Sequence, residues 1–282
     1  MIIDIHTHTF PDKIAAATLG KLSSLSHTTP FTDGTVAGLS RSVRQAGIDL
    51  AVVLPVATSP GQVEKVNDTS ARLNERTAET GVFSFGCIHP DFENWHSELD
   101  RISRLGLKGI KIHPVYQGAD LDDLRYLRIL DRAAELGLVV VTHAGLDVGY
   151  PGRVSCSPAM ALNALRQVGP VKLILAHMGG WRNWDEVEEL LADTSALLDT
   201  SFSLGALSPL NDGYYRPEDL PLLSEAQFVR MVRIFGAERI FFGSDSPWGD
   251  QGTDVSRLQA LPLTSEEKSA ILGGNAQQLL GL

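Results

Sequence analysis

The sequence predicts a (β/α)8 barrel, in which eight parallel strands form a closed ring and helices pack around the outside. Eight short apolar runs recur along the chain, and each is followed by a segment with helical periodicity. The runs have the near-continuous apolar character of strands that are buried on both faces. The length of 282 residues is close to the roughly 250 residues of a typical TIM barrel. We therefore expect one α/β domain over residues 1–282.

The first apolar run, MIIDIH, also carries polar residues. Strand alternation with period two places Asp4, His6 and His8 on one face and Ile3 and Ile5 on the other. Seven further apolar runs follow along the chain. All eight expected strands lie within residues 1–6, 49–55, 82–90, 106–114, 137–145, 171–180, 196–202 and 239–248.

Helices are expected between these runs. Leucines three or four residues apart indicate an amphipathic helix that stops at Gly137, and a similar pattern ends at Gly81. The final helix should begin at a Thr264 cap, with Glu267 three residues later. An open doubly wound sheet is the alternative, but the chain lacks the Gly-rich turn that this fold needs after its first strand.

Two long connections, 10–33 and 203–220, follow the expected first and seventh strands. In a barrel both would lie at the C-terminal face of the strands, where substrates bind, so either could act as a lid. The formal charge of −10, without a lysine or arginine run, argues against a nucleic acid or a membrane as partner. We expect a small-molecule substrate, and the chain could also form a homo-oligomer.

The chain has only two cysteines, Cys87 and Cys156, which is too few for a disulfide framework. It shows no recognisable signal peptide and no apolar run of the roughly 20 residues that a membrane span requires. These features together predict a soluble cytoplasmic protein.

Polar side chains gather at the C-terminal ends of the expected strands. Five of the eight histidines occupy such positions, together with one aspartate. In a closed barrel these ends converge on one mouth, so residues far apart in sequence can reach a common atom. The set consists of His6, His8, His113, His143, His177 and Asp245.

Imidazole nitrogens with one carboxylate suit Zn²⁺, or a similar divalent ion, better than Mg²⁺ or Ca²⁺. Three or four protein ligands would leave one position for water. Bound Zn²⁺ lowers the pKa of that water to about 7, and a nearby histidine can then accept or return a proton. The pattern therefore predicts a metal site at the mouth, where His6 and His8 form a two-pronged ligand.

Short motifs lie at the ends of the expected strands and at the end of the chain. They are His6-x-His8, KGIKIHP at 108–114, TH at 142–143, AHMGG at 176–180, GSDSPW at 243–248 and the closing GGNAQQLLGL. Taken together these motifs resemble the amidohydrolase superfamily, and the resemblance extends from the first residue to the last. They are most similar to its amidohydrolase-related (amidohydrolase 2) branch, which includes aminocarboxymuconate semialdehyde decarboxylase and related metal-dependent hydrolases.

The resemblance implies specific roles for these residues. His6, His8, His143 and Asp245 would bind the metal ion. His177 would be the general acid–base beside the metal-bound water, and Asp245 would also take part in proton transfer.

Lys111 points the same way as His113 in the expected fourth strand. Some superfamily members carry a carboxylated lysine there that bridges two metals. We expect instead an interior charge at Lys111 and one ion. If Lys111 is carboxylated, two ions would bind, with His143 and His177 on the second.

Loops after the strands should form the rim of the pocket. Arginines there can bind a substrate carboxylate in a bidentate manner. Asp199, on the expected seventh strand, either orders the pocket by hydrogen bonding or caps a turn. The expected substrate-binding residues are His113, Tyr116, Arg153, Arg182 and Trp248.

Three functions remain open at this point. The leading interpretation is a hydrolase that attacks a carbonyl, amide, ester or lactone centre with metal-activated water. The second is a non-oxidative decarboxylase of a small unsaturated acid, which should place Arg153 or Arg182 toward the metal. The third is a non-catalytic barrel that binds a metabolite and uses its ion as a structural staple.

Overall fold

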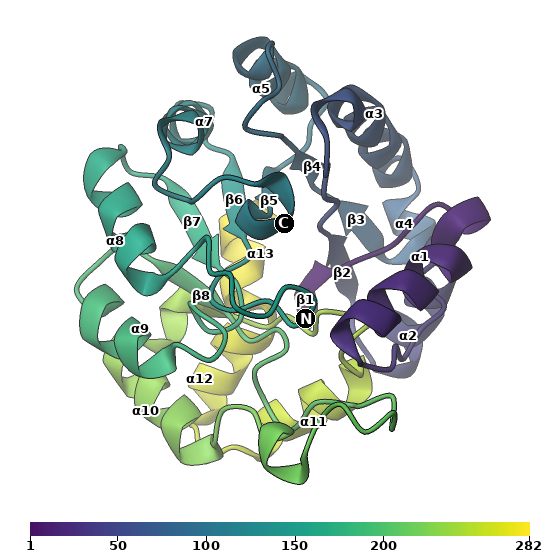
Figure 1. Cartoon of the computed structure of the whole chain (residues 1–282), viewed down its shortest axis with the longest axis vertical. Helices are drawn as coiled ribbons and strands as arrows, with labels where there is room; N and C mark the ends of the chain where they lie inside the picture. Colours follow the sequence, from purple (N-terminus) through teal and green to yellow (C-terminus); the bar gives the residue numbers. More distant parts are fainter.

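The computed structural model describes residues 1–282 and shows parallel strands surrounded by helices (Figure 1). Each predicted run contains a strand, and the third run contains two short ones. The strands are β1 (Ile3–Thr7), β2 (Leu50–Val53), β3 (Val82–Ser84), β4 (Gly86–Cys87), β5 (Gly109–Ile112), β6 (Val139–Thr142), β7 (Lys172–Leu175), β8 (Leu197–Asp199) and β9 (Ile240–Phe241).

Most of the helices form the outer layer in Figure 1, whereas α13 (Asn275–Leu280) lies inside the ring in this view. They start at recognisable caps in several places; for example, the side chain of Asp123 accepts a hydrogen bond from the Arg125 amide. The helices are α1 (Asp12–Ser26), α2 (Val36–Gln45), α3 (Val63–Asn74), α4 (Thr77–Thr80), α5 (Trp95–Arg104), α6 (Pro114–Gln117), α7 (Leu124–Glu135), α8 (Pro158–Gln167), α9 (Trp184–Leu191), α10 (Glu225–Phe235), α11 (Gln251–Ala260), α12 (Ser265–Ser269) and α13 (Asn275–Leu280).

Parallel pairing runs in two stretches, β1-β2-β3 and β4 through β9. The break falls at Phe85 inside the third predicted strand, where the Phe85 amide still donates to the carbonyl of Val53. At the other seam the Ile5 amide donates to the Phe242 carbonyl over 2.9 Å, which joins β1 to the segment after β9. The ring of parallel strands is therefore closed, and the predicted barrel is confirmed.

Two apolar layers stabilise the ring. The inner cluster combines strand residues such as Val52, Val139 and Phe241 with Leu280 of α13, so α13 covers one end of the barrel interior. The outer and larger cluster lies between the strands and the helices. Burial of apolar side chains on both faces explains why the strand sequences are almost continuously apolar.

The last helix differs from the prediction. Thr264 and Glu267 form the expected capping box, which begins α12. The continuous helix is nevertheless wrong, because a π-helical turn over 270–274 separates α12 from α13. At Gly273 in this turn a Cβ would lie 2.4 Å from the Met1 carbonyl oxygen, so the close approach of the first residues requires glycine.

Both cysteines, Cys87 and Cys156, are buried free thiols, which agrees with the absence of a disulfide framework. None of the helices combines the length and the apolar character that crossing a membrane would need.

The carboxyl group of Asp254 on α11 should make the protein less stable as the pH rises. Burial raises the pKa of Asp254 from 3.8 to about 7, and the ion pair with Arg257 only partly opposes this. Between these values the folded state holds a proton that the unfolded state has released, so the free energy of unfolding falls as the pH rises. From pH 5 to pH 8 this contribution is at most about 3 kcal/mol.

Asp254→Asn cannot ionise and should lose less stability than the wild type over this interval. Urea unfolding of both proteins at pH 5 and pH 8 measures the difference. Equal losses in the two proteins would contradict the assignment.

Candidate active site at the barrel mouth

An irregularity in β1 directs both His6 and Ile5 toward the barrel interior. Asp4 pairs with Ala51 of β2 and Thr7 pairs with Val53. Two residues thus lie between the paired positions in β1 but only one in β2, so β1 contains one extra residue, a β-bulge. Ile5 belongs to the inner cluster, as does Ile3, whereas the Asp4 carboxylate bonds to Ser244 and Gln251. The predicted separation of Asp4 from Ile3 and Ile5 is therefore confirmed, but the predicted common face of Asp4 and His6 is wrong. His6 reaches the interior because the bulge shifts the pleat by one residue.

His177 reaches the same centre by a different route. Strand alternation counted back from His177 predicts that Leu173 and Leu175 face inward, but both lie in the outer cluster, and Ile174 lies in the inner one. His177 follows the end of β7 with a φ of 61°, in the left-handed region that non-glycine residues rarely adopt. Asp245 has a similar φ of 62°. Such strained residues are typical of functional sites, where the surrounding structure maintains them.

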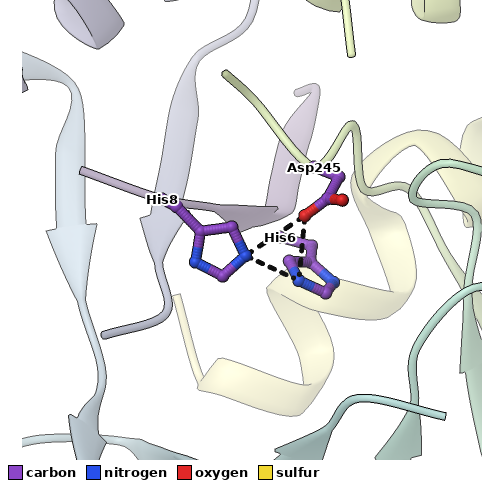
Figure 2. Close-up of side chains that lie close together, drawn as sticks. All are labelled: His6, His8 and Asp245. Atoms are coloured by element: carbon purple, nitrogen blue, oxygen red, sulfur yellow. Dashed lines mark hydrogen bonds and ion pairs between the residues drawn. The ribbon is translucent and has the colours of Figure 1, made fainter. Parts of the chain in front are cut away.

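His6, His8 and Asp245 bring three potential metal ligands together (Figure 2). The Nε2 atoms of the two histidines are 3.2 Å apart, and Asp245 Oδ1 lies 3.4 Å from His6 Nε2 and 3.1 Å from His8 Nε2. Ligands about 2.1 Å from a common ion are separated by about 3.0 Å at a right angle and by about 3.4 Å at the tetrahedral angle. The three donors therefore have the spacing of a metal site.

Hydrogen bonds to the other ring nitrogens prepare both histidines for this role. His6 Nδ1 lies 2.8 Å from Asp199 Oδ2, and His8 Nδ1 lies 2.9 Å from the carbonyl oxygen of Leu54. Both partners accept a hydrogen bond from Nδ1–H, so each neutral imidazole keeps its lone pair on Nε2. Asp199 thus orders the pocket by hydrogen bonding, one of the two roles predicted for it. Ser201, which the sequence analysis missed, also contacts His6 Nδ1.

Electrostatics favour a neutral histidine and an ionised carboxylate at this centre. Burial, together with the nearby charge of Lys111, holds the pKa of His6 well below its usual range. Burial opposes ionisation of Asp245, but its contacts with His8 and His6 outweigh burial and lower the pKa of that carboxyl. These are the protonation states in which both groups bind metal ions.

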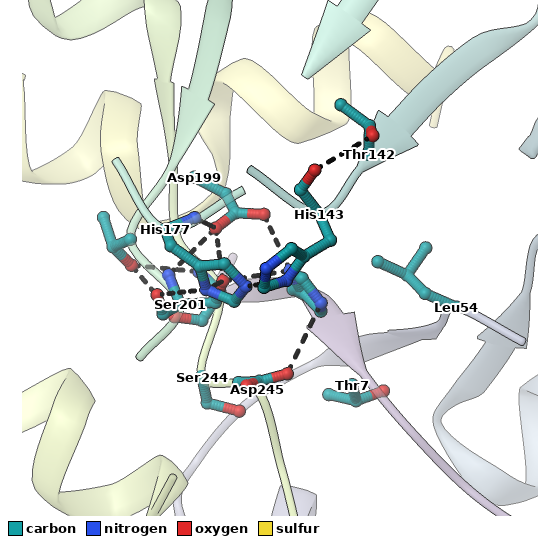
Figure 3. A network of polar contacts seen from close by, with 12 residues as sticks. Thr7, Leu54, Thr142, His143, His177, Asp199, Ser201, Ser244 and Asp245 are labelled. Carbon is teal, nitrogen blue, oxygen red and sulfur yellow. Dashed lines mark hydrogen bonds and ion pairs between the residues drawn. The ribbon is translucent and has the colours of Figure 1, made fainter. Parts of the chain in front are cut away.

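His177 and His143 form a buried relay next to the three donors (Figure 3). His177 Nδ1 lies 2.9 Å from the carbonyl oxygen of Ser201, and its Nε2 lies 3.1 Å from His143 Nδ1. Burial lowers the pKa of His177 to about 4, and the neighbouring His143 adds to the effect. His143 is not grouped with His6, His8 and Asp245, so its predicted role as fourth ligand stays a prediction.

Lys111 lies fully buried below the centre. Its Nζ is 3.2 Å from His6 Nε2, and burial lowers the pKa of its ammonium group to about 8 although Asp199 and Asp245 oppose the shift. The side chain thus places a charge in the barrel interior, as predicted. Its carboxylation stays a prediction.

A second cluster, formed by His113, His143 and Asp147, lies beside the first. Asp147 Oδ2 is 3.5 Å from His113 Nε2 and 3.8 Å from His143 Nε2. The ring of His113 is stacked between His143, at a centroid distance of 4.4 Å, and Tyr116, at 3.8 Å. The sequence analysis missed Asp147. Its position four residues after His143, in the Gly-rich loop after a strand, was the available signal.

The predicted arginines do not point at the centre. Arg153 is exposed and its Nε donates to Ser155. The guanidinium of Arg182 donates to the carbonyls of Pro221 and Asp219. Trp248 is half-buried, and its amide donates to the Asp245 carbonyl. Substrate binding by these side chains stays a prediction.

A cavity at the rim has a volume of about 500 Å³. Residues from the loops after β7 and β8 line this cavity, and the loop after β8 is the long connection 203–220 that was predicted as a possible lid. Its lining consists of Trp181, Arg182, Leu207, Tyr214, Tyr215, Glu218 and Asp219.

Replacing Gly145, two residues after His143, should destabilise the protein. Gly145 has a φ of +84°, and a Cβ there would lie 2.1 Å from the amide nitrogen of Trp181. Gly145→Ala is expected to cost about 2–4 kcal/mol, because the clash involves backbone that the site needs in place. Gly152→Ala is the matched control, since Gly152 has a similar φ of +88° in open space, and should cost about 1 kcal/mol. Equal losses in urea unfolding would contradict the steric explanation.

The fold and this constellation define a TIM-barrel protein with a metal-type centre of histidine and aspartate at the mouth. The amidohydrolase family model matches residues 3–282, so the chain belongs to the amidohydrolase family. This confirms the resemblance inferred from the motifs. No curated protein sequence matches the chain.

Solved structures share the fold over nearly all of both chains. An uncharacterised TIM-barrel protein from Bordetella bronchiseptica has a TM-score of 0.74 at 16% identity, covering 99% of this chain and 98% of the other. A dihydroxybenzoic acid decarboxylase from Polaromonas sp. JS666, with bound manganese and 2-nitroresorcinol, has a TM-score of 0.67 at 15% identity and covers 100% and 97%.

A third structure, from Pseudomonas putida and assigned as a 2-pyrone-4,6-dicarboxylic acid hydrolase, has a TM-score of 0.66 at 18% identity and covers 99% and 97%. At these identities the likeness establishes the fold alone.

Proposed function

We propose that the protein is a divalent-metal-dependent, non-oxidative decarboxylase of a small unsaturated carboxylic acid. The observation that carries this proposal is the metal-type triad of His6, His8 and Asp245 beside the buried acid–base candidate His177. Several structures with this fold are decarboxylases of aromatic acids, among them 5-carboxyvanillate and 2,6-dihydroxybenzoate decarboxylases. This reverses the order of the two catalytic interpretations drawn from the sequence.

The residues present fit a divalent ion. His6 and His8 direct unprotonated Nε2 atoms at one point, and Asp245 adds a carboxylate oxygen. Two imidazoles and a carboxylate suit Zn²⁺, our expectation from the sequence, and also Mn²⁺, which the Polaromonas enzyme contains. When bound, the ion would supply positive charge that holds and polarises the oxygen atoms of the substrate.

His177 would handle the proton. Loss of CO₂ from R–COO⁻ breaks one carbon–carbon bond, and one proton must be added to the carbon that remains. Because the His177 Nδ1–H is anchored on the Ser201 carbonyl, Nε2 is the atom available to deliver this proton. An anionic substrate beside the ring would favour its protonated form. The buried ammonium of Lys111 adds positive charge that stabilises the same anion.

A hydrolase is the second candidate, and one observation favours it. A decarboxylase was expected to place an arginine toward the metal, but Arg153 and Arg182 both bond elsewhere. In a hydrolase His177 would instead protonate the leaving group of an ester, lactone or amide.

The non-catalytic interpretation is less well supported. Structural zinc sites usually have four protein ligands, whereas three donors converge here. We keep the further proposals of one domain over residues 1–282, a small-molecule substrate and a cytoplasmic location.

The test combines metal analysis with two assays. Protein loaded with Zn²⁺ or Mn²⁺ is incubated with a panel of hydroxybenzoates and unsaturated aliphatic acids, and CO₂ release is measured. The same preparations are incubated with lactones, esters and amides. Metal-dependent CO₂ release supports the proposal. Hydrolysis without CO₂ release would replace it with the second candidate.

A further inference from the structure

The carboxylate of Asp4 is fully buried on the face of β1 opposite to His6, and it accepts four hydrogen bonds. Its Oδ1 accepts from the amides of His6, at 3.2 Å, and Ser244, at 3.0 Å. Its Oδ2 accepts from Ser244 Oγ, at 2.6 Å, and from Gln251 Nε2, at 2.7 Å. A carboxylate offers about four acceptor positions. Four donors therefore compensate the burial of this group without a cationic side chain beside it.

The partners of Asp4 are arranged to donate to it. The hydroxyl of Ser244 accepts from the Ser246 amide at 3.1 Å, so its own proton is available for Asp4 Oδ2. Gln251 begins α11 and is fully buried, yet its Oε1 has no partner. A buried oxygen without a partner is unfavourable. The one hydrogen bond that the Gln251 side chain makes is the bond to Asp4, which explains a polar side chain at this position.

These hydrogen bonds reach the backbone of all three donors of the triad. Asp4 Oδ1 binds the His6 amide directly. The amide of Asp245 donates to the His6 carbonyl at 2.8 Å, and the amide of His8 donates to the Ser246 carbonyl at 2.6 Å. One buried carboxylate thus joins β1 to the segment that carries Asp245, on the side of β1 away from the centre.

The backbone at Asp245 needs such support. Its φ of 62° lies in the left-handed region, which an aspartate maintains only where surrounding contacts require it. The residues on both sides of Asp245 belong to the Asp4 network, because Ser244 bonds to Asp4 and Ser246 bonds to the Ser244 hydroxyl. A Cβ at Gly243 would lie 2.8 Å from the His6 Cβ, so the two segments are also closely packed.

We propose that Asp4 is a positioning residue for the metal-type centre, which fixes the direction of the Asp245 carboxylate relative to His6 and His8. Asp4 is not one of the three converging donors, so it acts through the backbone that carries them. This inference rests on the proposed function only in taking the triad as a metal centre. It applies equally to decarboxylation and to hydrolysis.

The first test is hydrogen exchange of the metal-free protein, measured by mass spectrometry on peptides that cover 243–250. Asp4→Asn replaces one acceptor oxygen with an NH₂ group, which cannot accept from the Ser244 hydroxyl or from Gln251. We expect the amides of 244–246 to exchange at least about 10-fold faster. Glu98→Gln is the matched control, because Glu98 on α5 is also buried and its carboxylate accepts from Asn67 and Arg101.

The second test is metal affinity, measured for Zn²⁺ by competition with a chelator and followed by the absorption spectrum of bound Co²⁺. We expect about 10–100-fold weaker binding and a changed Co²⁺ spectrum in Asp4→Asn, and neither change in Glu98→Gln. Gln251→Leu keeps the carboxylate and removes one donor, so binding should weaken by about 3–10-fold. This variant decides the question if Asp4→Asn does not fold.

Two results would overturn the role of Asp4. One is faster exchange with unchanged affinity and Co²⁺ spectrum, which would make Asp4 a purely structural residue. The other is unchanged exchange at 244–246, whatever the affinity. A wild type that binds no ion would instead contradict the triad as a metal centre. Exchange in the metal-free variants would then still decide whether Asp4 holds the segment around Asp245.

Discussion

Asp245→Asn should release the ion bound by the triad and reduce kcat/KM by about 10³-fold or more. The substitution removes the only carboxylate among the three converging donors and leaves the shape of the side chain unchanged. A metal ion contributes several kcal/mol to stabilising charge in a transition state, which corresponds to a loss of this size. Metal content and the rate of substrate consumption should therefore fall together.

Two comparisons make the Asp245 result specific. Asp185→Asn changes an exposed aspartate outside the barrel and should retain both metal and activity. Asp199→Asn keeps every ligand but weakens the hydrogen bond that orients His6, so we expect an intermediate loss of about 10–100-fold. Full activity of Asp245→Asn with undiminished metal content would disprove the assignment of this residue.

The sequence predicted the barrel and the location of its site because both depend on strand pattern. The apolar runs arise because the strands of a barrel are buried on both faces. The C-terminal ends of these parallel strands must also meet at one mouth of the barrel. His6, His8 and Asp245 were therefore expected together, although they lie at opposite ends of the chain. The geometry confirms this expectation.

What the sequence did not predict depends on single residues that break the regular pattern. One extra residue in β1 puts His6 on the face opposite to Asp4, whereas strand alternation placed the two on the same face. Strand alternation placed His177 inward together with Leu173 and Leu175, but these leucines face outward, and His177 enters the centre through a left-handed backbone angle. Neither a bulge nor a positive φ at a non-glycine residue has a reliable local signal, because tertiary contacts maintain it.

Residues in loops were the other omission. Asp147 and Ser201 follow strands by several positions, so no periodicity indicates where their side chains point. The rim arginines show the opposite case, in which predicted residues bond away from the site. Arg182 is of a residue type that binds carboxylates, but its guanidinium already donates hydrogen bonds to backbone carbonyls of the next loop. Residue type thus suggests chemistry, but the loop conformation determines whether the group is free to perform it.

His177→Asn should reduce kcat by about 10²–10⁴-fold while leaving the bound metal in place, because His177 lies beside the triad and is not one of its three donors. Asparagine can still donate to the Ser201 carbonyl, but it has no basic nitrogen to accept or deliver a proton. The measurements are kcat, KM and metal content of the same preparation. Added imidazole should partly restore the rate if the ring acts as an acid–base, and would not do so if it only fills space. Loss of metal in His177→Asn would instead make His177 a ligand, as in the two-ion arrangement with a carboxylated Lys111.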